Sequence, residues 1–242
     1  MGAFRNEPLP KPPSYNESDV SDKPAEIRNK SLISASEEQK ITARYRGQLA
    51  SLLAVDDLVE RVVNELAATG ILNNTVIIFT SDNGFFHGEH RIRTEKFRVY
   101  EEDVHLPLLI RGPGFPQGAT RRQFVSNIDL APTIVDLANA SPGLVMDGRS
   151  LVPLAQNATL ATSRNLLIET LAYKAVRNKS FVYVEHRNAE QELYDMRKGT
   201  ANYDPYQLQS QHANSAYNQI KSQLAVTLNK LRTCSGENCE VQ

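Results

Sequence analysis

Two apolar runs that each stop abruptly at turn residues set the strongest limit on the fold. Thr75–Phe79 leads into Ser81-Asp82-Asn83-Gly84, and Pro107–Ile110 leads into Arg111-Gly112-Pro113-Gly114. Neither run alternates apolar with polar residues, which is typical of strands that are buried on both faces. Helical patterns precede the first run and follow the second, so the order of elements predicts an α/β fold.

A long helix is expected before the first strand, from about Glu37 to Thr69. Apolar residues recur there at three- and four-residue steps, and Gly70 is a stop signal. These residues are Leu49, Leu52, Leu53, Val59, Val62, Val63 and Leu66. Asp56 falls within this stripe, so we predict a buried, hydrogen-bonded structural carboxylate, with support of a site as the alternative. A short helix over Ala131–Leu137, with Pro132 near its first turn, follows the second strand.

The segments on either side differ from this central pattern. Residues 1–36 hold five prolines, which deny helix and sheet hydrogen bonds, and we expect an irregular segment packed on a larger body. Residues 37–154 are predicted to be the C-terminal part of an α/β domain. Residues 155–242 are predicted to form a small α+β subdomain of antiparallel sheet and helix.

The evidence for that subdomain is a change in residue pattern. Asn165–Glu169 and Ser180–Glu185 are typical of short strands. Residues 211–232 are typical of an amphipathic helix, with one side formed by Ile220, Leu224, Leu228 and Leu231.

Composition narrows the classes of partner. The net charge of -1 gives no global field that would favour nucleic acid or an anionic membrane. No stretch approaches the roughly 20 apolar residues of a membrane span, and the first thirty residues lack a signal-peptide pattern. The protein is therefore intracellular, or this chain does not start where the natural one does. N-x-S/T sequons favour a secreted or lysosomal protein; they begin at Asn16, Asn29, Asn73, Asn139, Asn157 and Asn178.

The chain has two cysteines, Cys234 and Cys239, in Cys-Ser-Gly-Glu-Asn-Cys. The spacing allows a small closed loop, so a disulfide is expected, and free thiols are the alternative. A zinc site would need more ligands than the neighbouring sequence offers.

The first strand ends in residues that suit a hard cation. In open α/β sheets, ligands sit beyond the carboxyl ends of strands. Asp82 supplies an anionic oxygen and Asn83 a neutral one, which suit Ca²⁺ or Mg²⁺, while Gly84 would let the chain turn sharply away. Lys96, His87 and His90 are donors that would meet an anionic substrate beside the ion. The alternative is an ordinary Asp-Asn-Gly turn followed by histidines without a function.

Several ordered motifs resemble one family. The stretch NNTVIIFTSDNGFFHGEHRIRTEKFRVYEEDVHLPLLIRGPGFPQG strongly resembles the type I sulfatases, and most of all their N-acetylglucosamine-6-sulfatase-like branch. The preceding YRGQLASLLAVDDLVERVVNELAATGILNNT is similar to the family's helix before the metal strand. Similar motifs follow, namely NIDLAPTIVDLA, MDGRSLVPL, ELYDM with DPYQL, and the closing cysteine loop LRTCSGENC.

The resemblance implies an alkaline-phosphatase-like α/β fold, part of whose sheet, sandwiched by helices, lies in this chain. It also implies a Ca²⁺ that polarises a sulfate ester. Asp82 and Asn83 match the last two calcium ligands of the family. Lys96 matches the lysine that binds the sulfate and helps the leaving oxygen depart. Tyr100 and Glu101 match a supporting "YE".

The two histidines match the family less well. His87 lies one place later than the histidine of close relatives, which argues against direct contact with substrate. His90 matches a "GEH" of many relatives, and a catalytic part for either residue stays a tentative expectation.

The family's nucleophile has no counterpart in the sequence. Sulfatases use a formylglycine made from the cysteine of Cys-x-Pro-x-Arg, whereas Cys234 is followed by Ser235-Gly236-Glu237 and Cys239 lies too close to the end. The family's early Asp-Asp pair is also absent. The chain therefore resembles the C-terminal half of a sulfatase, and we expect the formylglycine in a missing N-terminal half and no turnover by this chain alone. A truncated gene model, a split or processed polypeptide, and a degenerate family member all fit.

The expected activity is hydrolysis of sulfuric esters, with a sulfated carbohydrate or another sulfate ester as substrate. The N-terminal half of the same enzyme is an expected partner, and nucleic acid is not. Secreted, lysosomal and periplasmic locations all fit the family. The alternatives are a non-catalytic binding module and a phosphodiesterase of the same superfamily.

Overall fold

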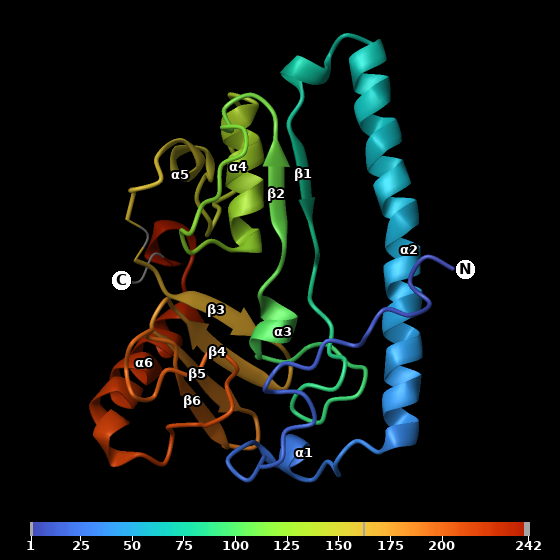
Figure 1. Ribbon diagram of the computed structural model, residues 1–242. Coiled ribbons are helices and arrows are strands. Elements are labelled where there is room, and N and C mark those ends of the chain that lie inside the picture. The colour runs from blue at the N-terminus through green and yellow to red at the C-terminus, as the bar shows by residue number, and fades with distance from the viewer. Residues whose placement is uncertain (1, 162, 240–242) are drawn as a thin grey trace. The chain divides into compact units, whose positions relative to one another are not determined.

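The computed structural model describes residues 2–161 and 163–239 (Figure 1). The chain divides into two compact units, Met1–Pro113 and Gly114–Gln242, which are described separately. The domain boundaries at 36 and 154 stay predictions. None of the helices formed by the described residues is long and apolar enough to span a membrane.

The start of the first unit is mostly irregular. Among the described residues before position 35, the short helix α1 spans Ala25–Arg28. Leu9 and Ile33 are buried in a cluster with Ile41 of the next helix, and Tyr15 and Tyr45 pack against it. The Pro-rich segment therefore packs on the first turns of that helix rather than hanging free.

The long helix is confirmed as α2, Ala35–Ala68 (Figure 1). Ser34 and Glu37 form a capping box, which satisfies the backbone donors at the start of the helix. The helix ends at Thr69, and Gly70 follows with φ +77°, the left-handed conformation in which glycine is favoured.

Most of α2 is not covered by any described part of the chain. Ile41 is its one buried residue, and all residues from 50 to 62 are exposed. The apolar stripe predicted from sequence therefore faces outward, with Leu52 52% exposed. The predicted burial of Asp56 is wrong for this structure, because Asp56 lies on the exposed part of the helix.

A 3-10 turn, η1 (Leu72–Asn74), leads into the predicted first strand, β1, Ile77–Thr80. It pairs with the second predicted strand, β2, Leu108–Arg111, in an antiparallel ladder from Ile77 opposite Arg111 to Thr80 opposite Leu108. This sheet has two strands in the described part of the chain. Burial on both faces was expected, but Phe79 is 38% and Leu109 61% exposed, because no further described strand or helix covers them. The loop between the strands carries the one-turn helix α3, Glu101–Val104.

The second unit begins with the 3-10 turn η2 (Asn127–Asp129), the helix α4 (Leu130–Leu137) and α5 (Val152–Gln156). The α4 helix confirms the prediction for 131–137. A buried Asp129 holds this region together, since its carboxylate accepts hydrogen bonds from Arg164 Nη1 at 2.8 Å and from the backbone N–H of Arg149 at 3.0 Å.

Four antiparallel strands follow in sequence order, β3 to β6, and α6 (Asn218–Leu231) packs on the sheet (Figure 1). Their bounds are Leu166–Glu169, Tyr173–Arg177, Phe181–His186 and Gln191–Asp195. The predicted strands β3 and β5 and the predicted helix are confirmed, although the helix starts at 218 after the 3-10 turn η3 (Ser215–Tyr217). Leu224, Leu228 and Leu231 of α6 form the core with Val176, Tyr183 and Leu193 of the sheet.

The last described turn is η4, Gly236–Cys239. A disulfide joins Cys239 of this turn to Cys234 before it, with an S–S distance of 2.04 Å. The backbone N–H of Gly236 donates to Asp147 Oδ1 at 2.6 Å, which ties this loop to the segment before α5.

Candidate metal and anion site

Three of the predicted site residues meet at the end of β1, within the first unit. Lys96 Nζ donates to Asn83 Oδ1 at 3.2 Å across 13 residues of sequence. The backbone N–H of Asn83 donates to Asp82 Oδ1 at 2.9 Å. Lys96 and Asn83 are therefore in contact, and Asp82 is the neighbour of Asn83 in the chain; these three residues are called the Asp82–Lys96 cluster.

The turn after β1 fixes the orientation of the Asn83 side chain. Asn83 Nδ2 donates to the carbonyl of Gly84 at 2.8 Å, which leaves Oδ1 toward Lys96. Ser81 Oγ donates to the carbonyl of Asn83 at 2.8 Å. Asp82 and Lys96 are exposed and Asn83 is half-buried, so a dissolved anion or cation has access to this cluster.

Gly84 is needed for close packing rather than for a turn. Its φ does not lie in the left-handed region, so the backbone conformation by itself does not require a glycine. A Cβ at this position would lie 2.0 Å from the carbonyl oxygen of Glu102 and 2.8 Å from the Cα of Asp103. The backbone after Asn83 therefore lies directly on α3.

Asp103 connects the segment that carries Asn83 with the loop that carries Lys96, and the sequence did not reveal this role. Its carbonyl accepts the N–H of Gly84 at 2.8 Å, next to Asn83. Its carboxylate Oδ2 accepts the N–H of Arg98 at 2.5 Å, in the loop that carries Lys96. Burial raises the pKa of the Asp103 carboxyl, although the backbone donor of Arg98 acts in the opposite direction. The part of Asp103 could not be read from the sequence, because both of its hydrogen bonds are made with backbone groups of other residues.

His90 is fully buried in a cluster of charged residues from the N-terminal segment and α3. Its Nδ1 lies 2.8 Å from Glu17 Oε2, and its Nε2 lies 3.7 Å from Glu102 Oε2. Burial by itself lowers the pKa of His90, but the carboxylates of Glu102 and Glu17 raise it by more. Lys23, also fully buried, pairs with Glu17 at 3.5 Å.

These contacts give His90 a part in packing. Its ring stacks on Tyr100 with centroids 4.2 Å apart, and Tyr100 is itself buried, which agrees with a supporting part for the "YE" pair. The tentative catalytic part of His90 stays a prediction, and its contacts do not include Asn83 or Lys96.

His87 contacts α2 rather than the Asp82–Lys96 cluster. Its Nε2 lies 2.5 Å from Gln48 Oε1, and its ring meets Tyr45 edge-on with centroids 5.3 Å apart. Burial lowers the pKa of His87, and the nearby Arg44 lowers it further. The neutral imidazole is thus favoured, and a catalytic part for His87 also stays a prediction.

The oxygen ligands that the cluster offers are of the type that a hard cation prefers, but they are too few to fill its coordination sphere. Asp82 and Asn83 offer a carboxylate and an amide oxygen, the ligands that Ca²⁺ and Mg²⁺ prefer. Ca²⁺ takes roughly six to eight oxygens. Residues 2–161 and 163–239 contain no group of three histidine, cysteine, aspartate or glutamate side chains placed to hold a metal.

The chain matches two protein-family models and several known proteins. The family model Sulfatase matches residues 6–140, and the model N-sulphoglucosamine sulphohydrolase, C-terminal, matches residues 88–234. The N-acetylglucosamine-6-sulfatase of Homo sapiens is 45% identical over 127 residues, which cover 52% of this chain and 23% of that protein.

Two solved structures are similar to this chain in fold. A structure determined in complex with its substrate D-glucosamine-2-N,6-O-disulfate has a TM-score of 0.69 and 30% identity, over 80% of this chain and 41% of the other. The phosphonate monoester hydrolase of Agrobacterium radiobacter has a TM-score of 0.67 and 26% identity, over 82% of this chain and 43% of the other. The chain thus spans less than half the length of these relatives.

The family models each cover more than half of the chain, and the solved neighbours share the alkaline-phosphatase-like fold that the sequence predicted. The chain is therefore a member of the type I sulfatase family and resembles its N-acetylglucosamine-6-sulfatases.

Proposed function

We propose that this chain is the part of a sulfuric ester hydrolase that binds the sulfate group of a sulfated sugar. The observation that carries the proposal is the contact of Lys96 Nζ with Asn83 Oδ1 at 3.2 Å in a member of the sulfatase family. This contact places the Lys96 ammonium, which would stabilise the departing oxygen, next to the amide oxygen of Asn83, which would bind a metal. The sugar is proposed from the sulfatases of N-acetylglucosamine that the chain resembles.

Each residue of the cluster has a separate part in the proposal. The Lys96 ammonium binds the sulfate and stabilises the negative charge that develops on the ester oxygen in the transition state. Asp82 and Asn83 would hold Ca²⁺, or Mg²⁺, through their side-chain oxygens. The bound cation would supply Lewis-acid polarisation of the ester. Asp103 keeps the two sides of the cluster together through the backbone groups of Gly84 and Arg98.

The nucleophile is proposed to lie outside this chain. The sequence contains no Cys-x-Pro-x-Arg, so no residue in it matches the family's formylglycine. The two cysteines are joined in a disulfide and are not available for that role. We therefore propose that this chain alone does not turn over substrate.

The exposed apolar surface of the first unit supports a partner segment. Residues 50–62 of α2 are exposed throughout, and Leu109 of β2 is 61% exposed. Soluble proteins rarely leave large contiguous apolar surfaces open. We propose that the N-terminal half of a sulfatase, on the same or another polypeptide, covers these surfaces and supplies the remaining metal ligands.

The location is proposed from the family and from the sequence. The six sequons are compatible with a glycoprotein that is secreted or lysosomal, and a periplasmic location fits a bacterial source.

Hydrolysis of a phosphorus ester is a second candidate. It is favoured by the similarity to the phosphonate monoester hydrolase, whose TM-score of 0.67 is close to the 0.69 of the structure with the sulfated glucosamine. Sulfate and phosphonate monoesters both carry negatively charged oxygens that Lys96 would bind, so substrate choice separates the two candidates.

The test starts with the genomic sequence upstream of this chain, read in frame for Cys-x-Pro-x-Arg. The polypeptide that includes the motif is assayed for release of sulfate from N-acetylglucosamine-6-sulfate and for cleavage of a phenyl phosphonate monoester. We expect sulfate release by the extended polypeptide and none by this chain alone. Lys96→Ala should lower kcat by about 10²- to 10³-fold, the effect of losing one donor to a developing oxyanion.

Three outcomes would contradict this proposal. Turnover by this chain alone would show that the nucleophile is within it. Preference for the phosphonate would favour the second candidate. Absence of the motif together with absence of turnover would identify a non-catalytic member of the family.

A further inference from the structure

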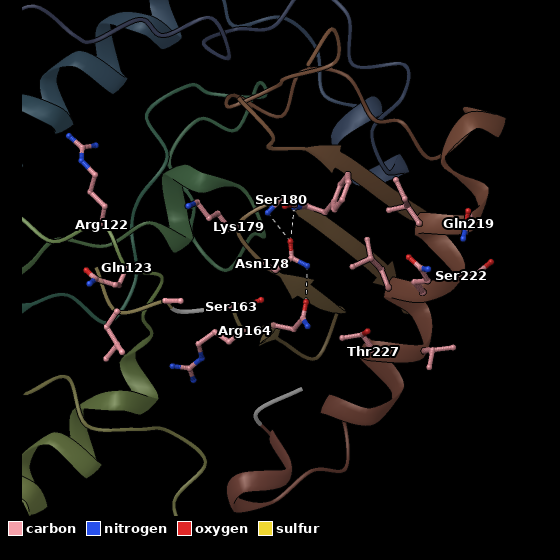
Figure 2. A pocket seen from close by; sticks show the side chains of 18 of the residues that line it. Arg122, Gln123, Ser163, Arg164, Asn178, Lys179, Ser180, Gln219, Ser222 and Thr227 are labelled. Carbon is pink, nitrogen blue, oxygen red and sulfur yellow. Dashed lines mark hydrogen bonds between the residues drawn. The ribbon is translucent and has the colours of Figure 1, made fainter. Parts of the chain in front are cut away.

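The second unit contains a groove that shares no residue with the Asp82–Lys96 cluster. Its volume is about 1140 Å³, at or above the roughly 300–1,000 Å³ of ordinary small-molecule pockets. It is lined by residues 122–123, by 158–161 and 163–165 before β3, by the β4–β5 turn at 178–181, and by one face of α6 (Figure 2). Its size suits a ligand of several linked units.

Most of the lining residues are polar, and none carries a carboxylate. Of these 20 residues, five carry side-chain amides, five carry hydroxyls and three are basic, and none is aspartate or glutamate. Amides and hydroxyls both donate and accept hydrogen bonds, which matches the hydroxyl groups of a sugar. Leu160 and Val226 are exposed at the groove and offer apolar surface for the C–H face of a sugar ring.

Two of the three cations are available to a ligand. Arg164 is buried and its charge is neutralised by Asp129 at 2.8 Å, so it belongs to the scaffold. Arg122 and Lys179 are exposed, and within the described residues neither forms a hydrogen bond or an ion pair. Figure 2 shows both side chains among the lining residues. A ligand with negative groups would therefore pair with cations that have no competing protein partner.

The turn that carries Lys179 is held in place by Asn178. Asn178 Oδ1 accepts the backbone N–H groups of Ser180 at 2.9 Å and of Phe181 at 2.8 Å (Figure 2). Asn178 Nδ2 donates to Asn165 Oδ1 at 2.7 Å. These bonds order the backbone on both sides of Lys179 before a ligand arrives, which lowers the entropy cost of binding.

We infer that this groove binds an anionic oligosaccharide, with Arg122 and Lys179 pairing with its negative groups. The groove would be a glycan-binding site within the second unit. That the negative groups are sulfates rests on the proposed function, whereas the location of the groove does not.

Binding to this chain is measured by isothermal titration calorimetry with three tetrasaccharides. These are a sulfated heparin-derived one, a carboxylated tetragalacturonate and the neutral chitotetraose. The variant Arg122→Gln/Lys179→Gln tests the groove. Arg187→Gln/Lys198→Gln removes the same two charges elsewhere in the second unit, where both residues are exposed. Lys96→Gln tests the other cluster.

We expect the sulfated tetrasaccharide to bind and the neutral one to bind more weakly. The groove variant should raise the Kd by about three- to thirtyfold, because it removes two exposed ion pairs. Raised salt should reduce this difference. The matched variant should change the Kd by less than about twofold.

Loss of binding in Lys96→Gln with no effect of the groove variant would overturn the inference while supporting the proposed function. Absence of binding by both charged tetrasaccharides would also overturn it. Equal binding of the sulfated and carboxylated tetrasaccharides, both weakened by the groove variant, would uphold the groove and remove sulfate as its selected group.

Discussion

The N–H of Gly84 donates to the carbonyl of Asp103 at 2.8 Å, so the backbone that follows Asn83 packs against α3 without a side chain between them. Glycine is required here because a Cβ would lie 2.0 Å from the carbonyl oxygen of Glu102. The position of Asn83 thus depends on a contact between two backbones.

Gly84→Ala should lower the free energy of unfolding by about 2 kcal/mol or more, since the backbone of α3 must move to admit the methyl group. Urea denaturation followed by circular dichroism measures the change. Gly47→Ala is the matched control, because no atom apart from the adjacent backbone of α2 and the two neighbouring residues lies within 4 Å of its Cβ position. It should be stabilising by up to about 1 kcal/mol, the difference in helix propensity. Equal effects of the two substitutions would contradict the close contact.

His90→Gln should lower the free energy of unfolding by about 3–5 kcal/mol, because Glu102 would lose its buried cationic partner and Glu17 would keep only Lys23. The pKa of His90 is raised in the folded state, so its contribution is fully present below the unfolded pKa of about 6.5 and is lost as the pH rises through the folded pKa. The wild-type protein should therefore lose more stability than the variant as the pH rises above about 6.5.

The quantity to measure is the difference in the free energy of unfolding between the wild type and His90→Gln at each pH. The pKa of His87 is lowered, chiefly by burial, so that residue changes stability with pH in the opposite direction in both proteins. His105→Gln, at a side chain that is 80% exposed, is the control for replacing a histidine by glutamine. A pH profile of His90→Gln parallel to that of the wild type would show that the pKa of His90 is the same in the folded and unfolded protein, which would contradict this prediction.

Ca²⁺ should bind this chain only weakly, because Asp82 and Asn83 provide two of the roughly six to eight oxygens that the ion takes. We expect millimolar Ca²⁺ to shift the backbone amide resonance of Asn83 in NMR spectra, and excess chelator to reverse the shift. Asp82→Asn should abolish the shift. Asp56→Asn, which removes an exposed carboxylate from α2, should not. Tight binding of Ca²⁺, with a micromolar Kd or below, would require ligands other than those proposed.

Asn178 should remain unmodified in folded protein secreted from eukaryotic cells, although Asn178-Lys179-Ser180 is a sequon. Its Nδ2 donates to Asn165 Oδ1 at 2.7 Å, so a glycan on that nitrogen would displace this hydrogen bond. Asn29 begins the same tripeptide and is exposed, which makes it the matched site. Mass spectrometry of glycopeptides measures occupancy, and a high fraction of Asn178 glycosylated in folded protein would contradict the prediction.

Periodicity predicted the helices well because it needs only local residues. The stripe of α2 and the stop at Gly70 gave bounds of 37–69 against the observed Ala35–Ala68. The strands β4 and β6 were missed. In β6 the buried position 192 is a glutamate, 1% exposed, whose charge hides the strand pattern. It is tolerated because His186 Nε2 lies 2.7 Å from it and Tyr194 donates to it, and neither bond can be read from spacing.

The site was predicted in part. Asp82, Asn83 and Lys96 were identified by their resemblance to a family motif, and the contact between Asn83 and Lys96 is present. The part of Asp103 was missed because it acts through backbone groups of distant residues. The exposure of Asp56 was not foreseen, because periodicity shows that a helix has an apolar face but not whether the same chain covers it.

The contacts of α2 with the preceding residues and with the loop after β1 lie in its first turns. Lys11 and Tyr15 bond to Glu38, Arg93 bonds to Glu37, and His87 meets Gln48. A helix of 34 residues is about 51 Å long, so roughly its last 30 Å projects beyond these attachments. In hydrogen-exchange experiments on this chain alone, amide protection should fall along α2 from Gln48 toward Ala68. Recovery of that protection on adding a candidate partner would give a direct assay for the polypeptide that completes the enzyme.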